Sequence, residues 1–112
     1  MSERDPILMA GVPELVVLRL LAQQEMYGYE IARSLKMLSH DVLTLGEGVL
    51  YPALHTLEAR RLLRSRSRQV SGRTRIYYQA TPRGRRRLER LTESWRRVSE
   101  GVERILGAPS HE

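Results

Sequence analysis

The spacing of apolar residues changes twice along this chain, and these changes limit the folds that it can adopt. Up to about residue 61 the apolar side chains recur every three or four positions, as on the buried face of a helix. From Leu62 to Ala80 the repeat shortens to two, the period of a β-strand. A helical period returns after Pro82. This order predicts a mainly α chain with a small β-hairpin, an α+β class.

Two helices are predicted in the first third of the chain. The first begins at Pro13, which suits an initial helical turn, and ends near Gln24. The second follows a turn at residues 27–28 and ends near Ser39. Its expected buried stripe consists of Ile31, Ala32, Leu35 and Leu38.

A third helix is predicted from near Gly48 to near Arg61. Its start follows from Pro52, which we expect in the first turn, where backbone N–H groups lack helical partners in any case. Its expected buried face carries Leu50, Leu54 and Leu57. The residues displaced from that face are Tyr51, His55 and Thr56.

A β-hairpin is predicted next, with its turn at residues 70–73. Arg64, Arg66 and Arg68 alternate with small or apolar residues, which places three guanidinium groups on one face of the first strand. Such a face repels itself unless solvent or a polyanion takes up the charge.

The last helix is predicted from Pro82 to about Leu106, with Thr81 as its N-cap. Its apolar residues follow an a/d heptad pattern, which is typical of helices that pair. They are Leu88, Leu91, Trp95, Val98, Val102 and Ile105. At roughly 37 Å this helix is long for one small subunit to cover, so we expect a homodimer. The alternative is a helix packed wholly inside its own domain.

The length of 112 residues suits one compact unit. We expect a winged helix-turn-helix domain at residues 1–81, a C-terminal dimerisation helix at 82–106 in the same unit, and a disordered tail at 107–112. In a winged helix-turn-helix the third helix enters the DNA major groove and the hairpin lies against the backbone or the minor groove.

Positive charge is concentrated in one part of the chain. The formal net charge is +6, yet residues 59–88 hold eleven arginines and no acidic residue. Such an asymmetry favours a polyanion, above all nucleic acid, as the partner. The alternative is an ordinary solvated basic face.

Several classes of function are not supported by the sequence. There is no cysteine, which excludes disulfides and thiolate metal sites. Ser39, His40 and Asp41 are consecutive and do not by themselves form a catalytic relay, and the three histidines lack metal-binding spacing. We therefore expect no enzyme, no metal and no cofactor. Without a signal-peptide pattern or a membrane-length apolar run, we expect a soluble cytoplasmic protein.

The predicted interface with double-stranded DNA combines the third helix and the hairpin. Tyr51, His55 and Thr56 can bond to base edges or phosphates, although His55 can equally be a structural histidine. The hairpin arginines are candidates for phosphate contacts, and one near the turn for the minor groove. They are Arg64, Arg66, Arg68, Arg73 and Arg75.

Several motifs of this chain resemble those of PadR-type regulators. They are YGYEI at 27–31, GVLYPAL at 48–54, LE at 57–58 and RIYYQATPRG at 75–84. The resemblance spans about residues 7–106 and implies a dimeric winged-helix repressor of the shorter subfamily, with one C-terminal helix. Such regulators often control responses to phenolic stress or drug efflux. One departure is Arg61, which stands where a glycine usually closes the recognition helix, so the helix is expected to run longer or to end without a glycine cap.

The segment from Glu93 to Val98 resembles the part of multidrug-sensing PadR members that presents a tryptophan to a pocket between subunits. This resemblance implies that Trp95 could stack on a planar aromatic or drug-like effector. The alternative is that Trp95 fills the dimer core. For the whole chain, two rival functions stay open: a winged-helix module that binds an acidic protein, and an RNA-binding protein.

Overall fold

The computed structural model describes residues 11–109, and these residues form four helices and one three-stranded sheet. Residues 1–10 of the predicted first domain and residues 110–112 of the predicted tail lie outside this range. The predicted α+β class is confirmed. In chain order the elements are α2 (Val12–Gln23), β1 (Met26–Tyr27), α3 (Gly28–Leu38), α4 (Glu47–Ala59), β2 (Leu63–Val70), β3 (Arg73–Ala80) and α5 (Pro82–Leu106).

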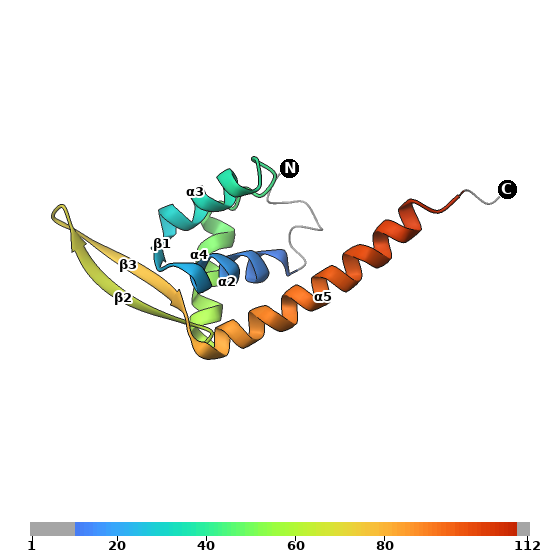
Figure 1. Cartoon of the computed structure of the whole chain (residues 1–112). Coiled ribbons are helices and arrows are strands. Elements are labelled where there is room, and N and C mark those ends of the chain that lie inside the picture. The colour runs from blue at the N-terminus through green and yellow to red at the C-terminus, as the bar shows by residue number, and fades with distance from the viewer. Residues whose placement is uncertain (1–10, 110–112) are drawn as a thin grey trace.

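The molecule is elongated because two elements project from a helical body. Helices α2, α3 and α4 form the body, the β2–β3 hairpin extends to one side, and the distal part of α5 extends to the other (Figure 1). The principal extents are 66 × 28 × 20 Å. Only the first part of α5 therefore packs against the body, mainly against α2.

Aliphatic side chains from the three body helices make most of the core, and the base of the hairpin and Leu88 of α5 complete it. Helix α2 is the central one, with Val17, Leu18 and Leu21 completely buried. Helix α4 buries the three leucines that the pattern predicted. In α3 the prediction was partly wrong, because Ile31 and Leu35 are buried whereas Leu38 is 71% exposed.

The sheet has one more strand than the sequence predicted. Its order is β1-β3-β2, and all pairings are antiparallel. The short β1 pairs Met26 with Tyr78 and Tyr27 with Tyr77, which joins the hairpin to the body. The hairpin turns at Ser71 and Gly72, both with positive φ, as a two-residue type I′ turn requires.

Helix α4 begins close to the predicted residue, but the reason given for that start is wrong. The helix starts at Glu47, so Pro52 is its sixth residue and lies beyond the first turn. Proline has no N–H to donate to the carbonyl of Gly48, one turn earlier. Gly48 is exposed to solvent, which can hydrate that carbonyl.

The end of α4 shows what replaces the expected glycine. The helix does not run longer: it ends at Ala59, and Arg61 adopts the left-handed conformation with a φ of 61°. The N–H of Arg61 bonds to the carbonyl of Glu58, and the N–H of Leu62 bonds to that of Leu57, both at 2.9 Å. These two bonds form a Schellman motif, whose left-handed residue is usually glycine. Here arginine takes that conformation, in which its Cβ is crowded by the backbone.

The start of α5 is fastened to the end of α4. Thr81 accepts a bond from the N–H of Gly84 at 3.0 Å and donates to the carbonyl of Arg61 at 2.7 Å, which confirms its predicted N-cap role. The N–H of Thr81 also bonds to the carbonyl of Leu62 at 3.1 Å. A side chain on Gly84 would overlap with that same carbonyl. The junction therefore requires glycine at position 84.

The left-handed arginine gives a stability prediction. Replacing Arg61 with glycine relieves the strain, so Arg61→Gly should raise the free energy of unfolding by about 1 kcal/mol. Arg60→Gly is the matched control: Arg60 has a φ of −85°, and glycine there should lower stability. Urea unfolding measures both, and an Arg61→Gly protein no more stable than the Arg60→Gly protein would contradict the closure described.

Candidate nucleic-acid interface

The three predicted contact residues of α4 are all exposed, but Tyr51 also has a packing role. Tyr51 is 38% exposed, and its hydroxyl lies so close to Gly28 that a side chain there would overlap with it. The ring thereby joins α4 to the start of α3. His55 lies 6.5 Å from Tyr51 between ring centroids and is exposed, as is Thr56. A polar surface on α4 thus lies open to solvent.

The hairpin carries its arginines on one face, as the alternation predicted. The register places Arg64, Arg66 and Arg68 opposite Gln79, Tyr77 and Arg75 of β3. Directly opposed residues of antiparallel strands share a face. The predicted hairpin residues are exposed apart from Arg75, which is half-buried. We call this surface, with the neighbouring Tyr27 of β1, the arginine face.

One carboxylate, Glu25, lies on the arginine face. Arg66 donates to it twice, from Nε to Oε2 at 2.8 Å and from Nη2 to Oε1 at 2.5 Å. Arg68 approaches the same carboxylate to 3.6 Å. The bond from Arg66, with the nearby guanidinium charges, lowers the pKa of Glu25 below its usual value, so the carboxylate is ionised at neutral pH.

Two tyrosine rings support arginines on the same face. The guanidinium of Arg68 lies 4.6 Å from the ring centroid of Tyr77, and that of Arg75 lies 4.5 Å from the ring centroid of Tyr27. The two rings are neighbours, with centroids 5.4 Å apart. Stacking over an aromatic ring restricts the otherwise flexible arginine side chain.

Glu25 and Tyr27 were not among the predicted site residues. Glu25 precedes β1 and Tyr27 is its second residue, and a two-residue strand is too short to show an alternating pattern. Glu25 is also 41 residues away from Arg66 in the sequence. Only the register of β1 against β3, which the structure supplies, places Tyr27 beside Tyr77.

Most arginines of the basic segment have no acidic partner in the part of the chain that the structure describes. Among residues 11–109, four of its eleven arginines form ion pairs with carboxylates: Arg66 and Arg68 with Glu25, and Arg60 and Arg87 with Glu14. The Arg87–Glu14 bond, at 2.9 Å, joins α5 to α2. Within the described residues, the other seven arginines of the segment have no carboxylate partner.

The heptad residues of α5 divide into two groups. Leu88 is buried and Leu91 half-buried, as part of the core or packed against it. The four later residues are exposed, between 47% and 76%: Trp95, Val98, Val102 and Ile105. A helix packed wholly inside its own domain is therefore not what the chain forms.

Comparison with known proteins identifies the family. A family model described as the transcriptional regulator PadR-like family matches residues 17–90. The transcriptional regulator Rv3488 of Mycobacterium tuberculosis is 40% identical over 97 residues, which span 87% of this chain and 85% of that protein. The chain belongs to the PadR-like family of transcriptional regulators.

Solved structures agree with this assignment. A PadR family transcription regulator from Clostridium difficile is 31% identical, with a TM-score of 0.74 over 87% of this chain and 100% of that one. A PadR-like transcriptional regulator from Bacillus cereus is also 31% identical, with a TM-score of 0.78 over 92% and 99%. The predicted winged-helix fold and the stated resemblance are confirmed.

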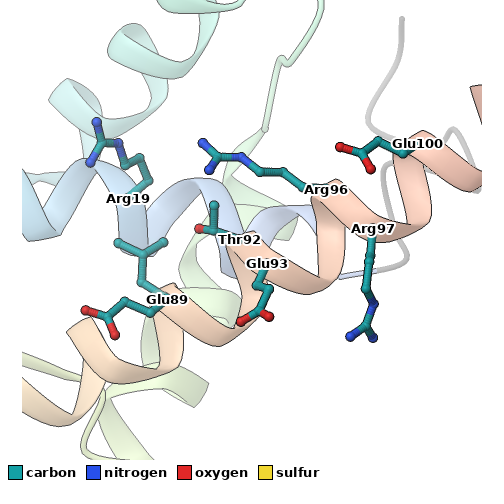
Figure 2. Close-up of a pocket in the computed structure, with 8 residues that line it drawn as sticks. Arg19, Glu89, Thr92, Glu93, Arg96, Arg97 and Glu100 are labelled. Carbon is teal, nitrogen blue, oxygen red and sulfur yellow. The ribbon is translucent and has the colours of Figure 1, made fainter.

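In this PadR-like regulator a groove of about 620 Å³ runs beside α5. It is lined by charged or polar side chains and Leu88, with Arg19 contributed by α2 and the rest by α5 (Figure 2). Arg96 extends from α5 toward the side of Arg19, while Glu89 and Glu93 add negative charge. Trp95 is not part of the lining. The resemblance implied a pocket between two subunits, so this groove within one chain is a different place.

Residues 11–109 contain neither a membrane-spanning helix nor a cluster of metal ligands. No helix in this range is both long and apolar enough to cross a membrane. The same range holds no group of three or more His, Asp or Glu side chains placed to bind one metal ion.

Proposed function

We propose that this PadR-like regulator is a sequence-specific DNA-binding repressor that acts as a homodimer on a palindromic operator. The observation that carries the proposal is the basic segment, in which seven of eleven arginines lack a carboxylate partner among the described residues. Guanidinium groups at this density suit the phosphates of duplex DNA.

Each element would have a distinct role on the duplex. Helix α4 would enter the major groove, where His55 and Thr56 would contact base edges and Tyr51 would contact an edge or a phosphate. The hairpin would lie against the backbone, with Arg64, Arg66, Arg68, Arg73 and Arg75 as the candidate contacts. Arg73 flanks the turn and has no ion pair in the described part of the chain, so it is free to bind a phosphate.

A second copy of the chain would cover the exposed part of α5. Four heptad residues and the neighbouring Leu106 form a continuous apolar strip at one end of an otherwise charged helix. Pairing of two such strips would bury them and hold the two α4 helices about 34–36 Å apart, one turn of DNA.

Selection from a random duplex pool tests the function directly. We expect recovered sequences with two inverted half-sites whose centres are about 10 bp apart. Titration against random duplex DNA, RNA and an acidic protein at two salt concentrations separates the rivals. Preference for RNA or for the acidic protein, with no enriched duplex, would contradict the proposal.

The salt dependence of binding tests the hairpin. Arg73→Gln should weaken binding to every duplex and reduce the slope of log affinity against log salt by about 0.9, the value of one lost phosphate contact. Arg104→Gln removes the same charge at the far end of α5, where Arg104 faces Glu100, and should leave the slope unchanged. Equal slopes for Arg73→Gln and the unmodified protein would remove this contact from the proposal.

A charge in the apolar strip tests the dimer. Val102 is 47% exposed in one chain, so Val102→Asp should fold normally but raise the dimer dissociation constant at least about 100-fold by placing a carboxylate in the interface. Glu103→Gln, one residue away from the strip, is the control. Sedimentation equilibrium gives the masses, and an aspartate variant that stays dimeric would contradict this interface.

An aromatic effector that releases the repressor from DNA would act at Trp95. The side chain is 47% exposed and is the only tryptophan, so its fluorescence is a clean signal. Flat aromatic compounds should quench it saturably and weaken operator binding over the same concentration range. A broad panel without saturable quenching would leave Trp95 as a residue of the dimer core alone.

A further inference from the structure

The ion pair between Glu25 and Arg66 adds a charged contact between the helical body and the hairpin, beside the β1–β3 pairing at Tyr27 and the hydrogen bond from Ser65 to Glu58 of α4. Glu25 lies between the end of α2 and the start of β1, so it belongs to the helical body. Arg66 is the fourth residue of β2 and belongs to the projecting hairpin. The carboxylate side chain is 20% exposed, whereas that of Arg66 is 62% exposed. The pair is thus anchored on the body side.

The ion pair occupies one edge of the Arg66 guanidinium and reduces what that side chain can offer to a phosphate. Arg66 uses Nε and Nη2 for the two oxygens of Glu25. That is one of the edges by which a guanidinium grips a phosphate with two parallel bonds. While the pair holds, this edge of Arg66 is occupied. Arg68, which stacks on Tyr77 and lies 3.6 Å from Glu25, is restrained by the same groups.

We propose that Glu25 is a positioning residue that clamps the wing, which is the β2–β3 hairpin, to the helical body through Arg66. The Arg66 ion pair then sets the angle between the wing and α4. Arg64 and Arg73 then supply wing contacts to phosphate. Arg64 donates to the neutral side chain of Gln79 at 3.1 Å, and among residues 11–109 neither Arg64 nor Arg73 forms an ion pair within 4.0 Å. This inference rests on the proposed DNA binding and assigns a distinct role within it.

A role for Glu25 as a mere competitor of DNA predicts a different change in DNA affinity when Glu25 is neutralised. If Glu25 only competed with DNA for Arg66, its neutralisation would free one guanidinium and tighten binding to every duplex. If Glu25 fixes the wing, neutralisation lets the wing take several angles. Binding to random duplex then stays equal or rises slightly with the added charge, while the advantage of the selected operator falls.

The experiment compares affinities for the selected operator and for random duplex of equal length. Glu25→Gln should lower the operator-to-random ratio about fivefold, the size expected for loss of a strong surface ion pair. Glu89→Gln makes the same charge change on exposed α5 and should leave the ratio unchanged. Arg66→Gln should lower the ratio to the same extent as Glu25→Gln, and its salt slope should match that of the unmodified protein.

Two further variants separate a clamp from a general loss of structure. The double variant Glu25→Gln with Arg66→Gln should behave like either single variant, because both remove one shared interaction. The charge exchange Glu25→Arg with Arg66→Glu should recover part of the operator-to-random affinity ratio. The unfolding midpoint of each protein shows whether the variant is still folded.

Each outcome decides between the ideas. A uniform gain of affinity in Glu25→Gln, or a salt slope reduced by about 0.9 in Arg66→Gln, would overturn the clamp and make Arg66 a phosphate contact. An unchanged ratio in Glu25→Gln would also overturn it. If the unmodified protein enriches no duplex at all, the proposed function fails instead, and that result is seen before any variant is made.

Discussion

The arrangement of the molecule depends on the close approach of Gly84 to the carbonyl of Leu62. At this point the closure of α4, the first residue of β2, the last residue of β3 and the first turn of α5 come together. Thr81 contributes three hydrogen bonds, two of them to the Arg61–Leu62 backbone. Because the backbones are in contact, the directions of α4, the β2–β3 hairpin and α5 are set together. A change in one of them would be transmitted to the others through very few atoms.

Electrostatics adds a second level of organisation. The basic segment does not present its arginines equally: some are fixed by Glu25, Glu14, Tyr27 or Tyr77, and the others have no carboxylate partner among residues 11–109. Fixed and free guanidiniums suit different tasks, since the first hold the wing and α5 in place and the second can neutralise an external anion. A surface of arginines alone would provide charge without orientation.

The sequence predicted elements with strong periodicity and missed those without it. The helices, the hairpin with its arginine face and the Thr81 cap follow from local patterns, and each is present. The strand β1 is two residues long, and the Glu25–Arg66 pair joins positions 41 residues apart, so no local pattern could indicate either. Pro52 and Arg61 were harder for another reason: α4 tolerates a proline in its second turn and a left-handed arginine at its end because packing of its leucines outweighs the local cost.

In the proposed dimer, two copies joined through α5 present their α4 helices at the spacing of successive major grooves. The absence of cysteine allows one spin label to be placed cleanly on the exposed face of α4, at Thr56→Cys. Double electron–electron resonance on the free protein should then give a single distribution of label-to-label distances. We expect its centre at about 34–36 Å, broadened by the label tethers. No dipolar modulation, or a centre far from one turn of DNA, would contradict the account.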